Sequence, residues 1–155
     1  VARSTRTARA SAIYFALFIS LSFVQHQRVK SYIEEIAQAR GHQKEKQKLN
    51  PTIGNIILWR SVYKSGDKYY IDAIRAGGSL KLYEGLAVNY LDAADLLTEA
   101  PNNEYIKQDI KRFTVFSQGF IYRHPDNSNI IADLRYGTLP NDNYSLWGIK
   151  LDYTT

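Results

Sequence analysis

Residues 10–24 read ASAIYFALFISLSFV, and no charged side chain occurs between Ala10 and Gln27. At about 1.5 Å per residue, this uncharged stretch makes a helix of about 27 Å, close to the ~30 Å hydrocarbon thickness of a bilayer. Large apolar side chains cover every side of that helix, so it belongs in lipid or inside protein. We therefore expect a transmembrane helix. A signal peptide and the core helix of a soluble protein are the alternatives.

The positive charge of the chain is concentrated around this apolar stretch. The 155 residues carry a net charge of +5. Residues 1–48 contain nine Lys/Arg and three Asp/Glu, whereas residues 49–155 contain eleven and twelve. The second part lacks the clustered cations of a nucleic-acid interface, so we expect no nucleic-acid partner. We expect residues 1–27 to be a basic flank and a transmembrane helix, with the lipid bilayer as partner.

Residues 28–48 have a different pattern. Val29, Ile33 and Ile36 recur at the spacing of one helix face, and Gly41 suits the position after a helix end. We expect an amphipathic stalk helix that lies on the following domain and continues into a solvated tether at 42–48.

From Leu49 onward the residues favour strands first, then helices, then strands again. This order predicts an α+β fold: the transmembrane and stalk helix, then an antiparallel β-sheet domain at 49–155 with two inserted helices. Turn residues and helix caps set the expected boundaries. The expected strands are 55–63, 69–76, 80–83, 119–123, 130–136 and 146–153. The expected helices are 93–100, capped by Asp92, and one ending near 116, capped by Asn102 or Asn103.

The sequence contains no motif for self-sufficient catalysis. The absence of cysteine excludes a disulfide scaffold, a Cys-ligated metal and a thiol nucleophile. There is no H-E-x-x-H, G-x-S-x-G, G-x-G-x-x-G or P-loop motif. His124 and Asp126 lie in H-P-D-N, which is typical of a turn. We therefore identify no catalytic residue and expect no metal bound by this chain alone.

Four residues in the expected strands are candidates for binding or docking. Asp133 and Arg135 are two apart, so on one strand they share a face and can pair or bind an anion. Trp59 and Arg60 point to opposite faces, so we expect one in the core and the other toward solvent or a partner. Tyr136 follows Arg135 directly.

Three stretches resemble the C-terminal part of bacterial inner-membrane metal-dependent hydrolases of the YbcI/YdjM type. They are NPTIGNIILWRSVY (50–63) with YYIDAIR (69–75), FTVFSQGF (113–120), and DLRYGTLP (133–140) with LWGI (146–149). The resemblance implies a bacterial inner-membrane location with a single span in this chain. It also implies a divalent metal, with zinc the expected ion, held by an upstream membrane portion of the intact protein.

The resemblance also suggests partners and site residues. The upstream membrane helices or another membrane protein are the expected partners. Trp59, Arg60, Arg135 and Tyr136 match the family pattern and are expected in substrate binding or docking, with Arg60 and Arg135 holding an anionic group such as a lipid phosphate. A non-catalytic, membrane-anchored interaction module or accessory subunit is the alternative function.

Overall fold

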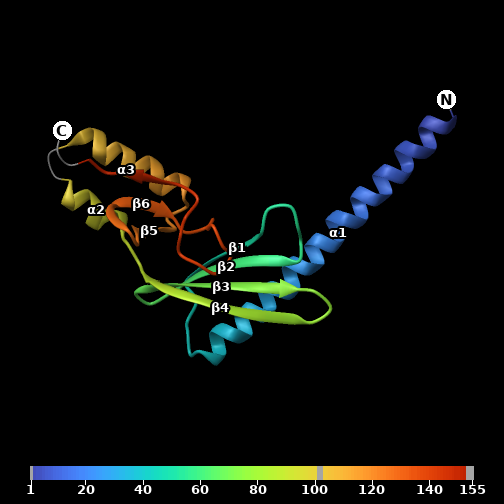
Figure 1. Cartoon of the computed structure of the whole chain (residues 1–155), viewed down its shortest axis with the longest axis horizontal. Helices are drawn as coiled ribbons and strands as arrows, with labels where there is room; N and C mark the ends of the chain where they lie inside the picture. Colours follow the sequence, from blue (N-terminus) through green and yellow to red (C-terminus); the bar gives the residue numbers. More distant parts are fainter. Residues whose placement is uncertain (1, 101–102, 153–155) are drawn as a thin grey trace.

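The computed structural model describes residues 2–100 and 103–152, and its α+β architecture confirms the expected fold class. Figure 1 shows a long N-terminal helix that extends far beyond a compact body of strands and two shorter helices. In chain order the elements are α1 (Ala2–Ala39), β1 (Lys46–Pro51), β2 (Leu58–Ser65), β3 (Lys68–Ala76), β4 (Leu80–Asn89), α2 (Ala93–Glu99), α3 (Glu104–Phe116), β5 (Ile121–His124), β6 (Asn127–Asp133) and β7 (Gly148–Lys150).

The strands form two antiparallel sheets. The first sheet has the order β1-β2-β3-β4, and the second has the order β5-β6-β7. Both inserted helices lie between β4 and β5 in the chain, as expected, and pack on the second sheet through Leu96, Ile110, Ile121 and Ile131. The side chains of Asp92 and Asn103 cap α2 and α3, and Asn102 lies outside the described residues.

The two halves of α1 have different surroundings. In the C-terminal half, Val29 and Ile33 are fully buried against Trp59 and its neighbours on one face of the first sheet. In the N-terminal half, the large apolar side chains are exposed, and Leu17, for example, is 65% exposed. This helix is the one candidate membrane span within the described residues, and none of its most apolar window is buried. Such exposure is not that of a core helix.

An ion pair fixes the C-terminal end of α1 to the same sheet face. Arg40 Nη1 donates to Asp72 Oδ2 at 2.6 Å, and Nη2 donates to Oδ1 at 3.1 Å. Arg40 also donates to the Tyr63 hydroxyl at 3.1 Å. The bond to Asp72, whose side chain is 2% exposed, raises the pKa of Arg40. The domain thus holds the C-terminal half of α1 by apolar packing and the end of the helix by an ion pair.

The opposite face of the first sheet packs against the second sheet. Val62, Tyr69 and Ile71 meet Phe120, Tyr122 and Leu134 in a continuous core. Both faces of β2 are therefore covered. Trp59 and Arg60 point to opposite faces, as expected. Both side chains are buried, at 2% and 4% exposure, so neither of them faces solvent.

Several element boundaries differ from the expected ones. The expected tether overlaps β1, whose first residue is Lys46. β2 begins at Leu58 because Asn55 Oδ1 accepts hydrogen bonds from the Ile57 and Leu58 amides and holds a loop there. β6 ends at Asp133, so Arg135 and Tyr136 lie in the turn that follows it. β7 is limited to 148–150, and residue 153 lies outside the described residues.

Ile33→Ala should lower the free energy of unfolding by about 2–5 kcal/mol, because it empties a packed site between α1 and the sheet. Ile13→Ala, at a position that is 61% exposed, should change it by less than about 0.5 kcal/mol. Denaturant unfolding of both variants in detergent, followed by tryptophan fluorescence, checks this. Equal losses would contradict the packing described for α1.

Candidate functional site

Three of the four candidate residues meet at one cavity. The cavity has a volume of about 260 Å³ and lies between the loop that joins β1 to β2 and the turn that follows β6. Arg60, Arg135 and Tyr136 contribute to its wall. Trp59 does not, because it lies on the α1 side of the sheet, where its ring centroid is 5.7 Å from that of His26. Two of the stretches that carry the resemblance, 50–63 and 133–140, therefore converge in space.

Arg60 joins the two sheets from a buried position. Its Nε and Nη2 donate to the Leu134 carbonyl at 3.2 and 3.0 Å, and its Nη1 donates to the Leu139 carbonyl at 3.0 Å. A guanidinium has five N–H donors. One N–H on Nη1 and one on Nη2 thus remain after these three bonds.

The charge of Arg60 is not neutralised by an ion pair with a carboxylate of the described residues. Asp142 and Asp133 act on it only through space, and burial lowers its pKa to about 10. Tyr122 lies near it, but burial raises the pKa of that phenol to about 12, so it stays neutral. At neutral pH Arg60 is therefore a buried cation without a salt bridge to a described carboxylate. Such a group is costly to keep in a fold.

Gly137 makes room for this guanidinium. A Cβ atom at this position would lie 2.6 Å from Arg60 Nη1 and 2.8 Å from Arg60 Cζ. Gly137 also pairs with Ser145 in an isolated β-bridge, which fixes the turn against its neighbour. The position of the Arg60 guanidinium therefore depends on the absence of a side chain at position 137.

Arg135 has a carboxylate partner, unlike Arg60. Its Nε donates to Asp133 Oδ1 at 3.0 Å, and its Nη2 donates to Asp133 Oδ2 at 2.7 Å and to the Phe116 carbonyl at 2.8 Å. Asp133 is fully buried and also accepts from the Trp147 indole at 3.2 Å. This pairing raises the pKa of Arg135. The expected pair exists, although Arg135 lies just beyond the strand.

Arg135 also keeps a donor for the cavity. Its Nη1 makes no hydrogen bond to another described residue, and its guanidinium carbon lies 5.3 Å from the centre of the Tyr136 ring. Asn50 Nδ2 donates to the Arg135 carbonyl at 3.3 Å and ties the end of β1 to this turn. The cavity is therefore lined by one cation without a salt bridge, one paired cation and the aromatic ring of Tyr136.

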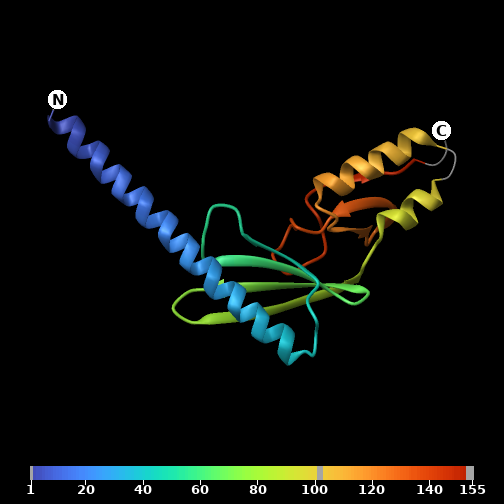
Figure 2. The same ribbon diagram turned by 180° about the vertical axis from the view of Figure 1, so that it is seen from behind.

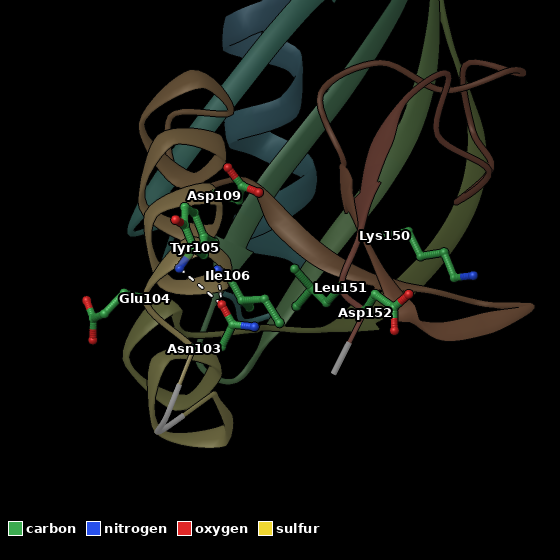
Figure 3. Close-up of a pocket in the computed structure, with 8 residues that line it drawn as sticks. All are labelled: Asn103, Glu104, Tyr105, Ile106, Asp109, Lys150, Leu151 and Asp152. Atoms are coloured by element: carbon green, nitrogen blue, oxygen red, sulfur yellow. Dashed lines mark hydrogen bonds between the residues drawn. The ribbon is translucent and has the colours of Figure 1, made fainter. Parts of the chain in front are cut away.

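A larger cleft of about 740 Å³ lies between the start of α3 and the segment after β7. Figure 3 shows its eight labelled side chains. Glu104 and Lys150 point to opposite sides, and Asn103 is occupied in capping the Tyr105 and Ile106 amides. The charged groups drawn there do not converge, so this cleft is a weaker candidate than the smaller cavity.

The histidines have structural contacts. His42 Nδ1 lies 2.9 Å from the Tyr63 hydroxyl, and His124 Nδ1 accepts the Asp126 amide at 3.3 Å within the expected turn. Within residues 2–100 and 103–152, no group of three or more His, Cys, Asp or Glu side chains could hold a metal ion. The metal that the resemblance implies is expected in an upstream membrane portion of the intact protein, and these residues do not test it.

Comparison with known proteins identifies no family. No family model, curated protein or solved structure matches the chain. The resemblance therefore stays a prediction, and functional inference starts from the geometry of the cavity.

Sequence reasoning missed the roles of Asn50 and Gly137. Neither belongs to a motif with a recognised chemistry, and their neighbours in the cavity are far away along the chain. One signal could have identified them: Asn50 lies in NPTIGN and Gly137 lies in DLRYGTLP, and both segments belong to the stretches that carry the resemblance.

Gly137→Ala should lower the free energy of unfolding by about 1–3 kcal/mol, because the new methyl group would meet the Arg60 guanidinium and, at 2.9 Å, the Leu139 carbonyl oxygen. Gly78→Ala, where no atom lies within 4 Å of the new Cβ, is the matched control. In an Arg60→Met background the cost of Gly137→Ala should fall, since the guanidinium is gone. The same cost in both backgrounds, measured by denaturant unfolding, would contradict the proposed contact.

Proposed function

We propose that this chain is a membrane-anchored domain that binds an anionic group in the cavity between Arg60 and Arg135, as part of a membrane-bound metal-dependent hydrolase. The observation that carries the proposal is the buried Arg60 guanidinium, which faces a cavity and has no ion-pair partner among the described residues. A bound anion would supply a direct ion-pair partner.

The donor geometry favours an oxyanion. The remaining N–H groups of Arg60 lie on its two terminal nitrogens, and guanidinium N–H groups bind phosphate and carboxylate oxygens strongly. Arg135 adds Nη1 and a second positive charge, partly offset by Asp133. Arg60 is the principal anion contact, and Arg135 is the secondary one.

The membrane and hydrolase parts of the proposal have different support. The exposed apolar half of α1 supports a membrane anchor. The resemblance supports a bacterial inner membrane, a metal-dependent hydrolase and a metal, expected to be zinc, bound by residues outside this chain. In this arrangement the cavity would hold the anionic part of a substrate, and the upstream membrane helices would be the partner.

The alternative is a non-catalytic interaction module that binds another membrane protein. The absence of a metal donor set from the described residues does not separate the two functions, because both place any metal outside this chain. Anion binding by the cavity is common to both functions, and metal dependence of the intact protein separates them.

Arg60→Lys should weaken the binding of inorganic phosphate by about 10-fold or more, because a lysine ammonium cannot make the several charge-assisted hydrogen bonds of a planar guanidinium. Calorimetric titration of the whole chain in neutral detergent measures this. Arg112→Lys, at a highly exposed position on α3, is the matched control and should bind like the unchanged chain. Equal affinity in all three proteins would remove Arg60 from the site.

Removal of divalent metal should abolish hydrolysis of a chromogenic phosphate ester by the intact membrane protein and should leave phosphate binding to this chain unchanged. Chelation followed by zinc restoration, with both readouts on matched samples, checks this. Hydrolysis that persists without metal would contradict the metal-dependent mechanism. Loss of phosphate binding on chelation would contradict a metal-independent anion site.

A further inference from the structure

We propose that the loop from Thr52 to Ile57, between β1 and β2, is a second membrane contact that seats one end of the first sheet on anionic lipid headgroups. This inference rests on the proposed membrane anchor in α1. It goes further because it assigns a lipid-binding role to a part of the folded domain.

The loop presents apolar side chains outward on a well-defined backbone. Ile53 is 92% exposed and Ile57 is 50% exposed. Asn55 Oδ1 accepts the amides of Ile57 and Leu58 at 2.9 and 2.7 Å, and the Thr52 amide donates to the Leu58 carbonyl at 2.8 Å. These bonds hold the loop in an ordered turn. The exposure of Ile53 is therefore part of the folded structure.

The loop lies where α1 leaves the domain. Figures 1 and 2 show it standing out from the end of the sheet toward the N-terminal half of α1. The Ala76 amide donates to the Ile57 carbonyl at 2.6 Å, and Gln25 Nε2 donates to the Ala76 carbonyl at 2.7 Å. Gln25 lies near the end of the charge-free stretch. If that stretch spans a bilayer, this end of the sheet lies at the level of the headgroups.

The charges around the loop match an anionic surface. The three segments that form this end of the domain are residues 24–30, 51–58 and 75–82, and none of them contains Asp or Glu. Their cations are Arg28, Lys30, Arg75 and Lys81. Arg28 also donates to the Gly77 carbonyl at 3.4 Å, so helix and sheet contribute to one basic rim. Exposed isoleucines beside segments that contain Lys and Arg and no acidic residue are typical of a contact with anionic lipid.

The contact has a consequence for the candidate site. Ile53 also lines the cavity that contains Arg60 and Arg135. Seating the loop on the membrane would place the edge of that cavity beside lipid headgroups. An anionic group carried by a lipid could then reach Arg60 without passing through bulk water.

The test uses single-cysteine variants, which the absence of native cysteine makes straightforward. Ile53→Cys carries an environment-sensitive fluorophore in the whole chain, reconstituted in bilayers of phosphatidylcholine and phosphatidylglycerol. Val115→Cys on α3, at a position that is 80% exposed, is the matched control for an exposed apolar site away from the rim. Leu17→Cys reports on α1.

We expect the label at 53 to show a blue-shifted emission that nitroxide lipids quench, and the label at 115 to show neither effect. Emission at 53 that matches the aqueous spectrum at 115, with quenching at 17, overturns the loop contact and leaves the anchor standing. An aqueous spectrum at 17 overturns the anchor and with it the basis of this inference. A blue shift at 53 without quenching by lipid indicates a protein partner and also overturns the proposal.

Charge variants test the choice of anionic lipid. Arg75→Gln with Lys81→Gln should lower the docking equilibrium of the loop by about fivefold for each charge removed. Lys111→Gln with Arg112→Gln, on exposed parts of α3, is the matched control and should leave docking unchanged. Docking that is equally strong in pure phosphatidylcholine, or unaffected by the first pair, would overturn the electrostatic part of the proposal.

Discussion

One helix in two environments is the constraint on which the rest of the structure depends. The C-terminal half of α1 packs into the domain through Val29 and Ile33, whereas the N-terminal half exposes apolar side chains on every side. A continuous helix transmits its direction from one half to the other, so any membrane that surrounds the first half also sets the orientation of the sheet. The position of the β1–β2 loop and of the basic rim relative to lipid follows from this connection.

The second constraint is the buried charge of Arg60. Two sheets pack against each other here, and an apolar side chain at this position would complete the core at lower cost. Instead, the chain places a guanidinium on backbone carbonyls, keeps position 137 free of a side chain, and leaves a cavity beside it. A local feature that lowers the stability of the fold, such as this buried charge beside a cavity, is typical of a functional site. This cost favours an anion site over a purely structural role.

The sequence predicted the features that depend on local pattern. The apolar and amphipathic parts of α1, the β2–β3 hairpin and the caps Asp92 and Asn103 all follow from periodicity and turn chemistry. It did not predict β1, because KQKLNP has no strand alternation and is an edge strand defined by its pairing with β2. The division into two sheets also depends on long-range pairing.

The candidate site was predicted in part for the same reason. Arg60, Arg135 and Tyr136 stood out by residue type, and they do share a cavity. Trp59 was grouped with them because it matches the pattern of the family that the chain resembles. As a neighbour of Arg60 on one strand it faces the opposite side of the sheet, away from the cavity. Burial of both residues could not be read from the strand itself, since it requires α1 on one face and the second sheet on the other.

The most direct test of the membrane anchor is a nitroxide scan of positions 13–24 in bilayers, with collision rates measured for oxygen and for a water-soluble nickel complex. A helix surrounded by lipid gives high oxygen collision and low nickel collision at every position, whichever side of the helix the label is on. A 3.6-residue periodicity, with one protected side, would place this helix against protein. High nickel collision throughout would place it in water, and either result would contradict the membrane anchor.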